Sequence, residues 1–236
     1  MSKRVAIVQS NYVPWRGYFD LVDSVDEFVL LDDAQYTRRD WRNRNKVKTP
    51  RGPQWLTVSV EVKGRYDQAI QDTRVADPAW AAAHWRFVRE TYAGAAGFDE
   101  MRGFLEQLYA TVPGPMLSDV NHHFLSAICE RLGIATALTW SRDYEPQGTK
   151  TDRLLDICRK ASATEYVSGP AAKPYLEVER FAAEGIDVAW HEYGPYAEYE
   201  QIHPPFEPHV SILDVLLCAG DRAGDLIRPV AVEGRP

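Results

Sequence analysis

The sequence predicts an α/β fold with a largely parallel sheet flanked by helices, and three observations favour this class. Residues 5–8 form a continuous apolar run, which is typical of a strand buried on both faces. An amphipathic stretch at 16–25 and a second apolar run at 27–31 complete the order strand, helix, strand. The same alternation returns after residue 135. We therefore expect one α/β domain over residues 1–236, with both halves of the chain contributing to one sheet.

A helical insertion separates the two halves of the predicted sheet, at about residues 77–133. Asp77 and Pro78 suit a helix start, since they stand in the order N-cap and first-turn proline. Gly133 suits the end of the last of three helices. Beyond the insertion we expect strands at 135–140, 165–167 and 186–191, and helices at 151–161, 173–184 and 211–219.

Residues 36–51 concentrate positive charge in a chain whose net charge is −7. Positions 38 to 51 hold seven Lys or Arg residues and one Asp. Four of these cations recur at every second position, so an extended segment would direct them to one face and the intervening asparagines to the other. With a turn at 49–52 and a strand at 54–62, we expect an N-terminal β-hairpin-like extension. The strip contains Arg39, Arg42, Arg44, Lys46 and Lys48, with Asn43 and Asn45.

Such a strip suits an anionic ligand. Arginine forks bind phosphate or carboxylate oxygens, and asparagines can hold neighbouring hydroxyl or amide groups. The flanking aromatic residues Tyr36, Trp41 and Trp55 would be unusual on a strand that only aids solubility. The alternative is a solvated edge strand whose charges prevent aggregation. We favour the anion site, and expect a phosphate-bearing or carboxylate small molecule as the substrate.

Length and composition exclude several classes of protein. A chain of 236 residues with 45% hydrophobic and 26% charged residues is typical of a soluble globular protein. The apolar run at 5–8 is too short for a signal sequence, and we predict no membrane span. Three cysteines that stand singly favour the cytoplasm as the location. The net charge of −7 argues against binding to duplex nucleic acid, which needs phosphate neutralisation over a large face.

Ligands of open parallel sheets bind beyond the C-terminal ends of the strands, so the loops at those ends are candidate sites. The loop after the first strand is rich in amides and aromatic rings, and we expect it either to bind ligand or to pack as a turn. The loop after the second strand carries two adjacent carboxylates, which cannot both face one point. We expect one to orient an arginine and the other to accept a proton from an amine, although ordinary salt bridges would also account for them. The two loops supply Asn11, Tyr12, Trp15 and Tyr18, and then Asp32, Asp33 and Gln35.

The loop after the strand at 165–167 leads into a predicted helix. Its Ser-Gly turn and lysine can hold a phosphate or carboxylate, with an ordinary strand-to-helix turn as the alternative. His122, within a helix expected at 118–132, is a candidate general base. No His, Cys or acidic group has the spacing of a metal site, so we predict no metal and no cofactor. The loop contributes Ser168, Gly169, Lys173 and Tyr175.

Three long motifs carry a resemblance to a known family. They are QSNYVPWRGYF at 9–19, DEFVLLDDAQY at 26–36 and RDWRNRN at 39–45. On these motifs the chain resembles the WbqC-like protein family over nearly its full length. The resemblance implies a connection with bacterial O-antigen or other surface-polysaccharide biosynthesis, and the transfer of an amino acid such as glycine onto an amino sugar.

We therefore expect an acyl or aminoacyl transferase that acts on an amine of a nucleotide-linked sugar, or of another intermediate in surface-polysaccharide or natural-product biosynthesis. Asp32, Asp33 and His122 would supply acid or base, and the cationic strip would hold the substrate. A thioester on an acyl or peptidyl carrier protein would be a suitable donor, because direct attack by an amine needs no protein nucleophile. Two alternatives stay open, namely a non-catalytic module that binds a carrier protein or nucleotide sugar, and an ATP-dependent amide ligase.

Overall fold

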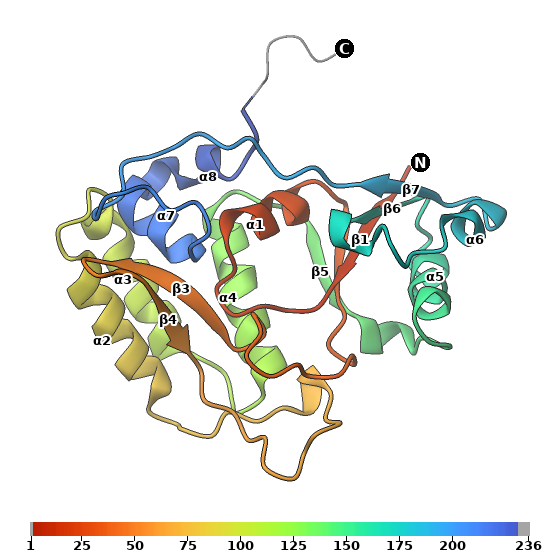
Figure 1. The fold of residues 1–236 in the computed structure, drawn as a ribbon, viewed down its shortest axis with the longest axis horizontal. Helices are drawn as coiled ribbons and strands as arrows, with labels where there is room; N and C mark the ends of the chain where they lie inside the picture. The colour runs from red at the N-terminus through yellow and green to blue at the C-terminus, as the bar shows by residue number, and fades with distance from the viewer. Residues whose placement is uncertain (1, 231–236) are drawn as a thin grey trace.

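The computed structural model describes residues 2–230 and has the predicted α/β class, with five parallel strands in one sheet (Figure 1). The strands lie in the order β5-β2-β1-β6-β7. From β1 the chain builds outward to β2 and β5, and it then places β6 and β7 on the other side of β1. The strand order thus reverses between β1 and β6. The strands are β1 (Arg4–Val8), β2 (Glu27–Leu30), β5 (Ala137–Trp140), β6 (Glu165–Ser168) and β7 (Asp187–Trp190).

Helices cover both faces of this sheet. Successive side chains of a strand point to opposite faces, so the two faces can be told apart by the clusters that neighbouring residues join. Val5 and Ile7 of β1 share a buried cluster with Leu155 and Phe181, which belong to α5 and α6. Ala6, which lies between them, belongs to the larger cluster formed with α1 and α4. The two helical layers lie on opposite sides of the sheet in Figure 1. These helices are α1 (Arg16–Asp23), α4 (Leu117–Arg131), α5 (Thr151–Lys160) and α6 (Val178–Ala183).

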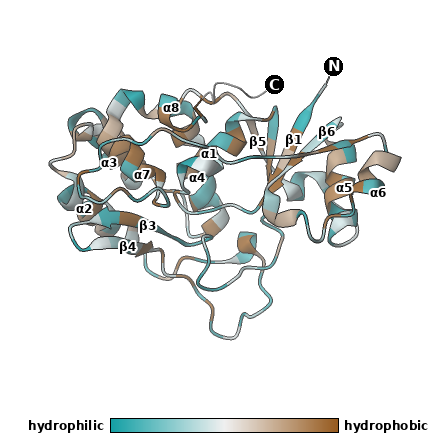
Figure 2. Ribbon diagram, turned by 45° about the horizontal axis from the view of Figure 1, so that its top comes forward, coloured by the Kyte–Doolittle hydropathy of each residue, from teal (hydrophilic) through white to brown (hydrophobic). Residues whose placement is uncertain are grey.

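The segment predicted as a helical insertion, 77–133, contains α2, α3 and α4, and α7 packs against α3 from the C-terminal part of the chain. The N–H of Gly97 donates to the carbonyl of Leu217 at 2.9 Å. Every residue of α7 is buried, and in Figure 2 this helix and much of β1 are strongly hydrophobic. The remaining helices are α2 (Trp80–Tyr92), α3 (Phe98–Ala110), α7 (Ile212–Ala219) and α8 (Ala223–Leu226).

The cationic segment forms a separate antiparallel hairpin, β3 (Arg44–Thr49) and β4 (Gly52–Thr57). Gly52 has a φ of +95°, which the turn between the strands requires and which favours glycine. The second strand is shorter than the predicted 54–62. After Thr57 the chain leaves β3, and Val60 instead bridges to Val75.

The helix predicted at 173–184 is also shorter, since only 178–183 is helical. Pro170 begins a short 3₁₀ turn, and Pro174 cannot donate the backbone hydrogen bond that a continuous helix needs. Gly133 ends α4 as expected, and Gly185 follows the end of α6, with φ of +74° and +73°. No helix within residues 2–230 is long and apolar enough to cross a membrane. The 3₁₀ segments are η1 (Ile70–Asp72), η2 (Ser141–Tyr144), η3 (Pro170–Ala172) and η4 (Gly220–Arg222).

Candidate functional site

A crevice of about 520 Å³ lies at the C-terminal ends of β1 and β6, where the strand order reverses. Open parallel sheets bind ligands at such a point, because the loops of the two strands diverge there. A larger cavity of about 660 Å³ lies along α2 and α3, but it is mainly apolar and its one charged lining residue is Glu106. The crevice is the better candidate, because it combines cations, hydroxyls and aromatic rings. Its polar and aromatic lining is Gln9, Lys150, Arg153, Tyr166, Ser168, Tyr175 and Tyr193.

The cations of the crevice come from the start of α5. Arg153 forms an ion pair with Asp33, whose other carboxylate oxygen accepts a 2.7 Å hydrogen bond from the Ser141 hydroxyl. Asp33 therefore orients an arginine at the sheet edge, which is one of the two tasks expected of the adjacent carboxylates. Lys150 precedes α5, is exposed, and has a φ of +51°. The positive end of the helix dipole adds to these charges, so this rim suits an anionic group. Neither Lys150 nor Arg153 was among the residues singled out from the sequence.

Three of the predicted binding residues lie in the crevice. Ser168 and Gly169 form its edge at the end of β6, and Tyr175 lines it while remaining 67% exposed. Tyr193 packs close to this edge, since a Cβ added to Gly169 would lie 3.3 Å from the Tyr193 hydroxyl. Lys173 lies on the outside, with Nζ 5.6 Å from the ring centre of Trp190.

Asp32 lies beneath this surface and only 1% of it is exposed. One carboxylate oxygen accepts the backbone N–H of Ser10 at 2.9 Å, and the other accepts the hydroxyl of Ser118. Burial raises the pKa of Asp32, while the hydrogen bonds from Ser118 and Ser10 act in the opposite direction. Asp32 therefore ties the loop after β1 to α4, and its oxygens do not face a ligand.

Arg42 and Asn45 support the same loop, and Asn43 supports the chain after β4. Arg42 is largely buried and donates to the carbonyl of Gln9 at 3.1 Å and to Asn11 Oδ1 at 2.6 Å. Asn45 donates to the carbonyl of Val13 at 3.1 Å. On the other side of the hairpin, Asn43 donates to the carbonyl of Val58 at 2.7 Å. These side chains hold the neighbouring backbone and, through Arg42, the side chain of Asn11.

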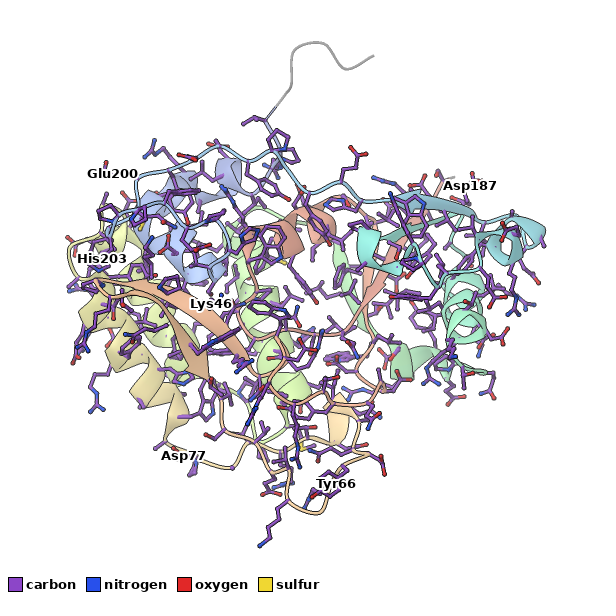
Figure 3. The ribbon with its side chains drawn as sticks, viewed as in Figure 1. Lys46, Tyr66, Asp77, Asp187, Glu200 and His203 are labelled. Atoms are coloured by element: carbon purple, nitrogen blue, oxygen red, sulfur yellow. The ribbon has the colours of Figure 1, made fainter. Side chains whose placement is uncertain are left out.

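The predicted row of cations is divided in the structure. Arg44 and Lys46 share a face with Trp55, at 4.0 Å and 5.3 Å from its ring centre. Lys48 is 1% exposed and donates to Gln201 Oε1 at 3.4 Å. The reason is tertiary, because the segment around Gln201 covers this end of β3. Figure 3 shows Lys46 near the middle of the molecule.

Tyr12 and Tyr18 are core residues in this structure. The Tyr12 hydroxyl lies 3.0 Å from His84 Nδ1, also 3.0 Å from the hydroxyl of Tyr109, and no part of Tyr12 is exposed. Tyr18 donates to the carbonyl of Gln9 at 3.1 Å and is 5% exposed. Both hold the loop after β1 from below, and neither reaches a ligand without local opening.

Asn11, Trp15 and Asn45 meet in a second, smaller pocket of about 170 Å³. We call it the tryptophan pocket. The indole of Trp15 lies over Gly17 at the start of α1. This position requires glycine, because a Cβ at Gly17 would lie 2.4 Å from the indole. The lining consists of Asn11, Pro14, Trp15, Trp41, Asn45 and His209.

Gln35 and Arg39 lie on the exposed connection before the hairpin. Gln35 donates to the carbonyl of Tyr66 at 3.0 Å. Arg39 has a left-handed φ of +58°, and its carbonyl accepts a hydrogen bond from Arg44. The two residues thus shape the approach to the hairpin.

His122 stacks on Trp140 with ring centres 4.2 Å apart, and burial lowers its pKa. Trp140 ends β5, the edge strand, so β2 separates this pair from the crevice. A different histidine lies beside the crevice. His191, directly after β7, has Nε2 3.1 Å from the carboxylate of Asp20, and both side chains are less than a tenth exposed. Its ring contacts Tyr193, with centres 4.7 Å apart.

The other groups that could bind a metal or act as nucleophiles are dispersed or buried in the part of the chain that the structure describes. No group of three or more His, Cys, Asp or Glu side chains is placed to hold a metal within residues 2–230. The cysteines Cys129, Cys158 and Cys218 are free and buried, and burial raises the pKa of each to about 12. A thiol with so high a pKa is a poor nucleophile at neutral pH.

Comparison with known proteins agrees with the motifs. The model of the WbqC-like protein family matches residues 9–225. A protein of Mycobacterium tuberculosis (strain ATCC 25618 / H37Rv), with the name Uncharacterized protein Rv1507c, is 50% identical over 226 residues, which are 96% of this chain and 98% of that relative. No solved structure gives a significant match. Since the family match includes the crevice, the hairpin and the helices between them, the chain belongs to the WbqC-like protein family.

Proposed function

We propose that this protein is an acyl or aminoacyl transferase that acts on an amine of a nucleotide-linked sugar or a related biosynthetic intermediate. The observation that carries the proposal is the crevice between β1 and β6, with Arg153 and Lys150 at one side and Ser168 at the other. The phosphate groups of the substrate bind the two cations. Asp33 acts as a positioning residue, because its ion pair fixes the direction of the Arg153 guanidinium.

The base in this proposal is His191. Asp20 holds Nε2 of its ring, which leaves Nδ1 to accept a proton, in the arrangement by which a carboxylate orients a catalytic histidine. The amine nitrogen attacks the carbonyl carbon of a thioester donor, and the new C–N bond forms as the C–S bond breaks. One amine proton passes to His191 and then to the departing thiolate. The sequence did not single out His191 as a base, because its partner is 171 positions away.

The test is incubation of the purified protein with aminoacyl thioesters and nucleotide-linked amino sugars, followed by mass spectrometry for a new amide. We expect the substitution His191→Gln to lower turnover by about 100-fold while nucleotide-sugar binding is unchanged. His203→Gln is the matched control, because Figure 3 places His203 at the far end of the molecule from β7. Absence of an amide product with the whole panel overturns the proposal.

A second candidate is a non-catalytic module that binds a nucleotide sugar or a carrier protein. It is favoured by the saturation of Asp32 and Asp33, since all four carboxylate oxygens accept hydrogen bonds or an ion pair. Tight binding of a nucleotide sugar together with no turnover of any thioester would support this candidate over the transferase.

A further inference from the structure

We infer that the tryptophan pocket binds one pyranose ring that carries a phosphate group. This inference does not depend on the transfer reaction, because it concerns a different cavity and rests on different side chains. Trp15 lines the tryptophan pocket and contacts Tyr193, which lines the crevice, with ring centres 5.4 Å apart.

The walls of the pocket are flat and apolar. Two indoles, Trp15 and Trp41, and the imidazole of His209 border a volume of about 170 Å³, which suits a single six-membered sugar ring. The C–H bonds on one face of a pyranose are apolar and slightly positive, so they pack well against the electron-rich face of an indole. Trp15 is already held in place by its contact with Gly17, so this wall is formed before a ligand arrives.

Two partly exposed indoles lie side by side at the edge of the pocket. Trp41 is 40% exposed and Trp55 is 43% exposed, and their ring centres lie 5.3 Å apart. Paired indoles in contact with water are unfavourable, and such patches mark places where another molecule binds. A ligand on Trp41 would remove part of this area from water.

The polar groups of the pocket suit hydroxyls. Arg42 is a donor only, so its 2.6 Å hydrogen bond to Asn11 fixes Oδ1 as the acceptor and leaves both Nδ2 hydrogens as donors. Those donors can bind sugar hydroxyl oxygens. Asn45 is already satisfied by backbone groups and forms part of the floor.

The charge beside the pocket is positive. Arg44 and Lys46 lie on the face of Trp55, next to Trp41, at 4.0 Å and 5.3 Å from the ring centre. Two carboxylates lie nearby. Asp40 is 3.5 Å from the Arg42 guanidinium, and Glu207 is 3.7 Å from His209 Nδ1. The cations on Trp55 therefore provide a place for a phosphate at the edge of a sugar ring.

The experiment measures binding of three probes by calorimetry, namely a panel of hexose and hexosamine 1-phosphates, the corresponding free sugars, and inorganic phosphate. We expect Trp41→Ala to weaken the sugar phosphate at least tenfold. The double substitution Arg44→Ala and Lys46→Ala should weaken the sugar phosphate to the level of the free sugar. Tyr66→Ala is the matched control, because Tyr66 is 69% exposed and carries Arg38 at 4.8 Å from its ring centre, in a loop distant from Lys46 (Figure 3).

Two outcomes overturn the inference. One is that no sugar phosphate of the panel binds to folded wild-type protein at millimolar concentration. The other is that Trp41→Ala binds as tightly as Tyr66→Ala. The variant Arg159→Met, whose side chain pairs with Glu184 outside both cavities, should bind the sugar phosphate like the wild type. Failure of the transferase assay with this binding intact would remove the proposed function and leave the sugar site in place.

Discussion

Two polar clusters at the C-terminal edge of the sheet contain the same kinds of side chain and have opposite surroundings. Around Asp32, the Ser10 N–H and the Ser118 hydroxyl donate to the carboxylate, and Arg42 Nη1 donates to the carbonyl of Gln9. Around Asp33, the paired Arg153 faces an open crevice. Asp32 and Asp33 are adjacent in the sequence, yet Asp32 belongs to a buried network and Asp33 to an open site. The difference shows that burial, rather than residue type, separates a structural arginine or aspartate from one that can meet a ligand.

Removal of the Asp32 carboxylate should have the largest effect. We expect Asp32→Ala to lower the free energy of unfolding by about 4 kcal/mol, because the Ser118 hydroxyl and the Ser10 N–H lose their acceptor in the interior. Asp33→Ala is the matched control and should cost about 1 kcal/mol, since its partner Arg153 is partly exposed. Urea denaturation measures both values. Equal losses would show that the two clusters do not differ as the contacts indicate.

The loop after β1 contacts α2 through a partly buried histidine, His84. The free energy of unfolding should therefore depend on pH. His84 Nδ1 lies 3.0 Å from the Tyr12 hydroxyl, and burial lowers the pKa of His84 to about 4 from the ordinary 6.5. Between these values the unfolded chain binds the proton more strongly than the folded chain. Stability that is present above pH 6.5 is therefore lost as the pH falls towards 4, by roughly 3 kcal/mol.

The variant His84→Gln isolates this contribution, because glutamine can accept from Tyr12 and donate to the carbonyl of Thr57 without titrating. Unfolding of wild type and variant at a series of pH values from 7 to 4 gives the comparison. Burial raises the pKa of Asp32 and Asp214, and their contribution therefore changes in the opposite direction and is common to both proteins. Parallel pH profiles would contradict a role for His84.

The sheet was predictable because its strands β1 and β2 are short apolar runs that are buried on both faces. The hairpin was predictable in part. Alternation correctly placed Arg44 and Lys46 on one face, but it gave no sign that Lys48 lies under the segment around Gln201. That contact joins residues 153 positions apart, and local periodicity carries no information about it.

The crevice was predictable at Ser168 and Gly169, since a loop that follows a parallel strand must lie at the ligand-binding edge. The same rule applied to the loop after β5 would have led to Lys150 and Arg153. His191 was harder to assign, because its significance depends on Asp20, which approaches it from α1. Tyr12 was predicted to bind substrate and instead lies in the core. An aromatic residue in a candidate loop is as suited to the core as to a ligand.

Substitution of Arg153 should have the smallest effect on folding and should identify the open cluster. We expect Arg153→Met to weaken uridine diphosphate binding about tenfold, which corresponds to about 1.4 kcal/mol, because the cation aimed at the crevice is lost. Its free energy of unfolding should change by less than about 1 kcal/mol, since the side chain is partly exposed and Ser141 still donates to Asp33. Arg159→Met, on the same helix and 3.6 Å from Glu184, is the control for lost surface charge. Calorimetric titration of both variants measures the two affinities for uridine diphosphate. Equal affinities would mean that the crevice does not use Arg153 to bind its ligand. The ion pair of Arg153 with Asp33 would then be structural, like the network around Asp32.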